Sequence, residues 1–128
     1  MAEKDGSREK LQHRPLIAVV GPCASGKSSL VRKLKALGYN ARHVAQDHSY
    51  VPDMWQRLTN PDLLIFLDAK LGTIARRRRI SWGERYLADE RHRLRHARQH
   101  CDLYLATDDL TEQEVLKKVI TFLEEHNR

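Results

Sequence analysis

Segment 21–28 constrains the fold more than any other part of this 128-residue chain, because it reads GPCASGKS and matches the pattern G-x-x-x-x-G-K-[ST]. In this P-loop pattern the glycines let the backbone curve around phosphate groups, so that successive N–H groups point at the anion. Lys27 brings a positive charge to the β- and γ-phosphates, and the Ser28 hydroxyl can bind Mg²⁺. The segment therefore predicts a site for ATP with Mg²⁺.

The flanking segments are those that the pattern requires. Segment 15–20 (PLIAVV) is a continuous apolar run, typical of a buried strand. After the pattern, apolar residues recur at helical spacing from Leu30 to Leu37, and Gly38 follows as a stop signal. Strand, glycine-rich loop and helix in this order support the motif. The predicted nucleotide-binding residues are Gly21, Cys23, Ala24, Ser25, Gly26, Lys27, Ser28 and Ser29.

Strand and helix patterns alternate along the rest of the chain. Short apolar runs predict strands at 41–45, 62–67 and 103–106. Helical patterns predict a turn at 54–58, a helix from Leu71 into a run of arginines, a helix over 84–101, and a last helix that begins with the capping box of Thr111 and Glu114. The alternation predicts an α/β fold with three layers, in which helices flank a small, mostly parallel sheet.

Asp47, Asp68 and Asp108 each follow one of these predicted strands. The carboxyl ends of parallel strands share one edge of a sheet, and ligands bind at that edge. Because Mg²⁺ that bridges two phosphates needs a carboxylate beside the P-loop serine, Asp47 and Asp68 are both candidate metal residues together with Ser28. The alternative for either residue is a helix cap or a loop position.

Four consecutive arginines, residues 76–79, form the next pattern. On a helix, Arg76 and Arg79 share a face, whereas Arg77 and Arg78 point elsewhere. Arginines that close over a transferring phosphoryl group stabilise the charge on its oxygens. Arg76 and Arg79 are therefore predicted catalytic residues, and Arg77 and Arg78 are interpreted as a solvated basic face. The predicted catalytic set is Lys27, Asp47, Arg76 and Arg79.

Composition limits the partners of the chain. A formal net charge of +6 favours anionic partners such as nucleotides and nucleic acid. The chain has two cysteines, Cys23 and Cys101, with no Cys-x-x-Cys pair, which fits a reducing cytoplasm, and no apolar run is long enough to suggest a membrane partner. Residues 1–14 are polar and predict a disordered tail before a single nucleotide-binding domain at 15–128.

Three segments resemble one family of enzymes. Segment 21–30 (GPCASGKSSL) resembles the opening of nucleotide and shikimate kinases, and segment 61–69 (PDLLIFLDA) looks like the P-D-strand-L-D segment of thymidylate and deoxynucleoside kinases. In those proteins a lid that bears arginines follows, as residues 76–79 do here. Segment 101–108 (CDLYLATD) resembles their last strand. From Pro15 onward the chain is thus similar to small thymidylate, shikimate and adenylate kinase-like enzymes.

The resemblance implies a P-loop NTPase fold with strand 62–67 beside the P-loop strand. It implies phosphoryl transfer from Mg·ATP to a small acceptor that enters near residues 47–55. It also implies that the acid after the second strand, Asp47, serves the metal ahead of Asp68.

The family's acceptor-binding region between the P-loop helix and the lid strand is larger than segment 39–62 here, so the acceptor site is stunted, remodelled or absent. An ATPase or nucleotide switch without an acceptor is therefore the first alternative. A nucleic-acid-binding module is the second, because arginines continue from Arg76 to Arg98 beside Trp82 and Tyr86.

Overall fold

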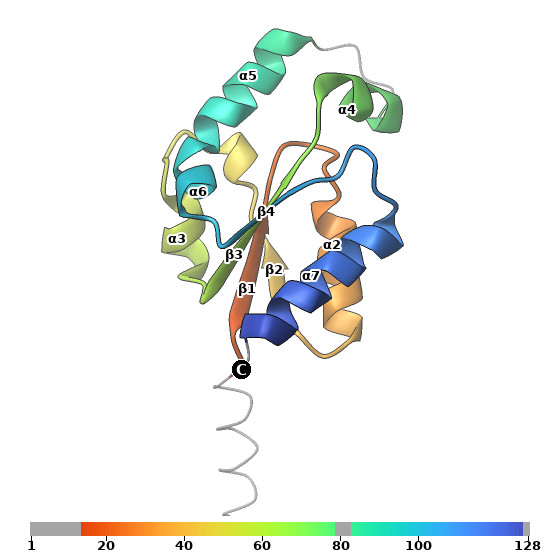
Figure 1. Ribbon diagram of the computed structural model, residues 1–128. Helices are drawn as coiled ribbons and strands as arrows, with labels where there is room; N and C mark the ends of the chain where they lie inside the picture. Colours follow the sequence, from red (N-terminus) through yellow and green to blue (C-terminus); the bar gives the residue numbers. More distant parts are fainter. Residues whose placement is uncertain (1–13, 79–82, 127–128) are drawn as a thin grey trace, which may run out of the picture.

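Four parallel strands form the sheet in the computed structural model, which describes residues 14–78 and 83–126 (Figure 1). They are β1 (Leu16–Val20), β2 (Asn40–His43), β3 (Leu63–Asp68) and β4 (Leu103–Ala106). Their order across the sheet is β2-β1-β3-β4, and all three pairings are parallel. Val19, for example, is in register with His43 on one side and with Ile65 on the other. The predicted α/β class with a parallel sheet is confirmed, and β3 lies beside β1 as expected.

Helices connect the strands and cover both faces of the sheet (Figure 1). The helical elements are α2 (Lys27–Ala36), the 3₁₀ turn η1 (Gln46–His48), α3 (Met54–Thr59), α4 (Leu71–Arg78), α5 (Glu84–Arg93), α6 (Arg95–His100) and α7 (Glu112–His126). The predicted capping box is present at the start of α7, since the Glu114 amide donates to Thr111 Oγ1 over 3.1 Å and the Thr111 amide donates to Glu114 Oε1 over 2.9 Å. No helix among residues 14–78 and 83–126 is long and apolar enough to cross a membrane.

Alternate residues of the buried strands supply two separate cores, because successive side chains of a strand point to opposite faces. Ile17 and Val19 of β1 belong to the core under α2 and α7, where Leu34 and Val119 are fully buried. Ala18 and Val20 of β1 belong to the core on the other face. Residues that include Trp55 of α3, Leu94 between α5 and α6, and Ala97 of α6 belong to that second core as well. Burial on both faces explains why β1 and β3 read as unbroken apolar runs.

The carboxyl ends of the strands lie together at the top of the molecule in Figure 1, opposite the C-terminal end of α7. The loop after β1, the turn η1, helix α4 and the connection from β4 to α7 all begin at this edge. A third, small core of Ala69, Ile74 and Leu87 joins α4 to α5 above it. Functional side chains from distant segments can therefore meet at this edge.

The single helix expected over 84–101 is divided into α5 and α6 at Leu94. Gln46 explains the division. Its side-chain Nε2 donates to the Arg93 carbonyl over 3.0 Å, and an uninterrupted helix would use this carbonyl for its own i→i+4 bond. A side chain that takes a place in the helical ladder bends the helix. The prediction of one helix was wrong because the helical pattern carries no sign of this contact.

Two predictions fall wholly or mainly outside the described residues. They are the disordered tail at 1–14, of which only Arg14 is described, and the catalytic role of Arg79; the side chain of Arg78 and the aromatic Trp82 lie outside the described part as well.

Candidate functional site

The loop of residues 21–26, here called the glycine loop, connects β1 to α2 and requires glycine at its first position. Gly21 has φ +154°, and a Cβ atom there would lie 2.0 Å from the backbone oxygen of Leu67 in β3. Gly26 has φ +107° and immediately precedes α2. Both conformations suit glycine better than any residue with a Cβ atom. The loop can therefore lie tightly against β3 and begin a helix at its other end.

Lys27 is the first residue of α2, and its ammonium group turns back into the glycine loop. Its Nζ donates to the Gly21 carbonyl over 2.5 Å and to Asp47 Oδ1 over 3.0 Å. The side chain is only 12% exposed. A positive charge is therefore fixed at the start of a helix and beside the loop amides, where an anion is favoured by both the charge and the helix dipole.

Asp47 lies in η1, directly after β2, and is buried. Besides the ion pair with Lys27, its Oδ2 lies 3.4 Å from His48 Nε2. Its backbone carbonyl accepts a bond from Arg93 Nη1 over 2.8 Å. The structure thus brings two predicted site residues, Lys27 and Asp47, into direct contact.

Glu90 of α5 is a site residue that the sequence reasoning missed. Its side chain is fully buried against the glycine loop, and its Oε2 accepts the Cys23 amide proton over 3.2 Å. Burial, followed by the neighbouring Asp47 carboxylate, raises the pKa of Glu90 to about 7 from an ordinary value of 4.5. A sequence signal existed: Glu90 lies three residues after Leu87 and four before Leu94, on the apolar stripe of its helix.

Asp68, the second candidate metal residue, has other partners. Its Oδ1 accepts the Ala69 amide over 2.8 Å, and its Oδ2 accepts the Tyr104 hydroxyl over 2.5 Å. Arg91 Nη2 lies 3.5 Å from Oδ1. Both oxygens are thus engaged by α5 and by the ends of β3 and β4, whereas Asp47 contacts the P-loop lysine.

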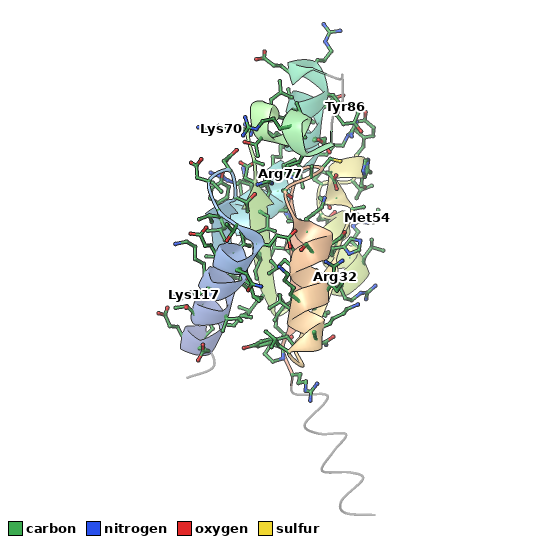
Figure 2. All side chains as sticks on the ribbon, turned by 90° about the vertical axis from the view of Figure 1, so that its right-hand side faces the viewer. Arg32, Met54, Lys70, Arg77, Tyr86 and Lys117 are labelled. Atoms are coloured by element: carbon green, nitrogen blue, oxygen red, sulfur yellow. The ribbon has the colours of Figure 1, made fainter. Side chains whose placement is uncertain are left out.

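Arg77, which the sequence pattern left on a solvated face, contacts the glycine loop. Its Nη1 donates to the Ala24 carbonyl over 2.8 Å, and its Nη2 donates to the Thr107 carbonyl over 2.7 Å. Arg76 instead lies 3.5 Å from Thr73 Oγ1 on its own helix. Figure 2 shows Arg77 at the level where α2 and α7 begin. Arg77 is exposed, as the sequence interpretation expects, but it also bonds to the loop, a contact that the sequence pattern does not predict.

A cavity of about 310 Å³ lies next to the glycine loop. Its lining includes Ala24, Ser29, Arg77, Thr107, Leu110 and Glu112. The walls come from the loop, α2, α4 and the β4–α7 connection, so the cavity shares the strand-end edge with Lys27. Its size is at the lower end of the range for small-molecule sites.

Part of the segment at 47–55, where an acceptor was expected, lies against α5 through Arg93. Asp47 and Trp55 are buried, and Trp55 packs in the core with its Nε1 donating to His96 Nδ1. Tyr50 is exposed, and the Arg93 guanidinium lies 4.4 Å from its ring centroid and donates to its hydroxyl. Trp55 is therefore a core residue, whereas Tyr50 lies at the surface beside Arg93.

A second set of arginines lies away from the glycine loop. Arg91, Arg95 and Arg98 line a cavity of about 390 Å³ together with Asp68, Gln99 and Tyr104. The Arg98 guanidinium lies 3.7 Å from the centroid of the Tyr104 ring. This surface carries more positive than negative groups and an aromatic ring at the edge strand β4.

The donor set suits a hard divalent cation. Ser28 is the second residue of α2 and is exposed, so its hydroxyl is accessible to a ligand. Asp47 supplies a buried carboxylate that contacts Lys27, the residue before Ser28. Ser25 Oγ in the loop is buried without a hydrogen-bond partner among the described residues. Hydroxyl and carboxylate oxygens are the ligands that Mg²⁺ prefers.

Comparison with known proteins adds no relative, since neither a protein-family model nor a curated protein matches this sequence.

Proposed function

We propose that this chain is a Mg·ATP-binding phosphotransferase of the nucleoside and nucleotide kinase type, with the P-loop NTPase fold. The observation that carries the proposal is the position of Lys27. Its ammonium group lies inside the glycine loop between the Gly21 carbonyl and the Asp47 carboxylate, both of which a polyphosphate with Mg²⁺ would replace as partners. The cytoplasm is the proposed location.

Each neighbouring group has a part in this proposal. The loop amides and Lys27 would bind the phosphates, and Ser28 with Asp47 would hold Mg²⁺, which supplies charge neutralisation for the transferring phosphoryl group. The cavity beside Arg77 would take the nucleoside end of the nucleotide. Arg76 and Arg79 remain predicted lid arginines.

A Lys27→Ala variant tests the nucleotide site. Mg·ATP binding, measured by isothermal titration calorimetry, should weaken by on the order of 100-fold, and any turnover should fall at least as much, since one preorganised charge contact is lost. Lys35→Ala, which removes a charge from the exposed end of the same helix, is the matched control and should bind as the wild type does. Unchanged ATP binding in a folded Lys27→Ala protein would refute the proposal.

An ATPase or nucleotide switch without an acceptor is the second candidate. The contacts of α5 with segment 47–55 favour it, because Arg93 already engages Asp47 and Tyr50 of the expected acceptor region. Phosphate release from ATP should be compared with and without a panel of nucleosides, nucleotides and small hydroxyl compounds. Stimulation by one of them supports the kinase, and hydrolysis that none of them increases supports the ATPase.

A nucleic-acid module is the third candidate, and the arginine-lined cavity beside Tyr104 favours it. Binding through phosphates weakens steeply with salt, with a log-log slope of roughly −0.9 per phosphate contact on duplex DNA. Tight, salt-sensitive binding of an oligonucleotide by a protein with no nucleotide turnover would select this candidate over the other two.

A further inference from the structure

Two buried carboxylates, Asp47 and Glu90, come together beside the glycine loop. Asp47 arrives from η1 after β2, and Glu90 arrives from α5, 43 positions later in the sequence. An oxygen of each carboxylate lies within 4.8 Å of the other, and both residues are almost completely inaccessible to solvent. Burying two acids side by side is costly unless a positive charge or a proton compensates them.

His48 completes the group. A carboxylate oxygen of Asp47, a carboxylate oxygen of Glu90 and a ring nitrogen of His48 all lie within 4.8 Å of one another. His48 Nε2 itself is 3.4 Å from Asp47 Oδ2. Ligand atoms around one cation lie at roughly 2.0–2.6 Å from it, so a triangle of this size needs little or no contraction to enclose an ion.

The hydrogen-bond partners of these carboxylates neutralise only part of their negative charge. Lys27 contacts Oδ1 of Asp47, and the Cys23 amide contacts Oε2 of Glu90. Oε1 of Glu90 is buried and receives no hydrogen bond within the described part of the chain. When both carboxylates are ionised they can only accept hydrogen bonds, so the pair then needs a cation as a further partner.

We propose that Asp47, His48 and Glu90 form a divalent-cation site that the protein fills without a nucleotide. This site would lie beside Lys27 and would use Oδ2 of Asp47, leaving Oδ1 to the ammonium group. A cation there leaves an excess of positive charge next to the loop amides, which would favour an incoming polyphosphate.

The ligand types select the class of cation. Two carboxylates suit Mg²⁺, Ca²⁺ and Mn²⁺, and an imidazole suits Zn²⁺ and other transition metals. Mn²⁺ accepts both kinds of ligand, so the site is assigned to an ion of the Mn²⁺ type. The assignment goes beyond the proposed nucleotide function, because the three ligands are protein groups and require no phosphate.

Mn²⁺ titration of the full chain in the absence of nucleotide tests the proposal, with free Mn²⁺ measured by electron paramagnetic resonance. We expect one bound ion per chain. Glu90→Gln and His48→Ala should each weaken its binding at least about tenfold. Asp89→Asn is the matched control, because this exposed acid precedes Glu90 on the same helix and should leave the affinity unchanged.

If Glu90→Gln fails to fold, the His48→Ala variant still tests the proposal. The His48 side chain is 57% exposed, so its removal should leave the core intact. Absence of Mn²⁺ binding by the wild type, or wild-type affinity in a folded His48→Ala protein, would overturn the cation site. Mg·ATP binding by the same samples is measured separately. If Lys27→Ala loses ATP binding but still binds Mn²⁺, both proposals are supported. If the wild type binds Mg·ATP but not Mn²⁺, the cation site is refuted and the nucleotide site is not.

Discussion

Asp47 has the most consequential position of any single residue, because its two oxygens face different partners. Oδ1 contacts the P-loop lysine, and Oδ2 faces His48. Asp68 is the last residue of the longest strand and matches the usual sequence pattern of a metal acid equally well, yet it bonds to Tyr104 and to the Ala69 amide. Substitutions of Asp47 and of Asp68 are therefore expected to have different effects.

Asp47→Asn should reduce Mg²⁺-dependent turnover more than Asp68→Asn does. The first change removes a negative charge beside Lys27, and the second disturbs contacts at the ends of β3 and β4. Turnover measured over a Mg²⁺ titration distinguishes them. A larger defect in Asp68→Asn would mean that β3 supplies the metal acid and would weaken the likeness to kinases.

Arg77→Ala should weaken Mg·ATP binding about tenfold, since the guanidinium makes charge-assisted bonds to the Ala24 carbonyl of the glycine loop. Arg76→Ala, one residue away on the same helix, should change ATP affinity less and should lower kcat more if Arg76 acts in the transition state. Steady-state kinetics and calorimetry on both variants measure these effects. Equal losses of affinity would show that the loop contact of Arg77 has no special role.

At the scale of elements, helix α5 decides how much of the site is accessible. Its residues Glu90 and Arg93 cover η1, and Gln46 of η1 in turn bonds to the carbonyl at which α5 ends. The helix, the turn and the glycine loop thus hold one another in place. Helix α7 has a comparable role at the cavity, where its first turn supplies part of the lining.

The capping box of α7 provides a prediction at this scale. Thr111→Ala should lower the free energy of unfolding by about 1 kcal/mol, because the Glu114 amide loses its side-chain acceptor. Thr121→Ala, in the exposed interior of the same helix, is the control and should be neutral or slightly stabilising. Urea unfolding followed by circular dichroism measures both. Equal stability of the two variants would mean that the box contributes nothing.

At the scale of the whole molecule, the buried Glu90 links folding to pH. Burial raises its pKa to about 7, so between its ordinary value and 7 the folded protein binds a proton more tightly than the unfolded chain does. The stabilisation is complete at acidic pH and is lost as the pH rises through 7. The ionised form of the buried Glu90 is the one that destabilises the folded protein.

Glu90→Gln should therefore remove part of the pH dependence of stability. We expect its free energy of unfolding, relative to the wild type, to rise by on the order of 1–3 kcal/mol between pH 5 and pH 8. Urea unfolding at both pH values, with EDTA to remove metal ions, gives the difference between the proteins. A constant difference across this range would show that Glu90 titrates as an exposed glutamate.

The sequence by itself determined the parallel α/β architecture and the strand-loop-helix unit at residues 16–36. These follow from local properties: unbroken apolar runs in strands buried on both faces, glycine at the positive-φ positions Gly21 and Gly26, and apolar residues at helical spacing. The Thr111–Glu114 box was equally predictable, because both of its bonds lie within four residues.

Tertiary structure alone decided which side chains meet at the strand ends. Glu90 reaches Cys23 across 67 positions, and Arg77 reaches Ala24 across 53. Helical spacing predicts which residues share a face of a helix. The direction in which that face points depends on how α4 and α5 pack over the sheet. The break at Leu94 has the same cause, since Gln46 lies 47 positions from the carbonyl that it occupies. Contacts that depend on the relative placement of whole elements have no local pattern from which they could be predicted.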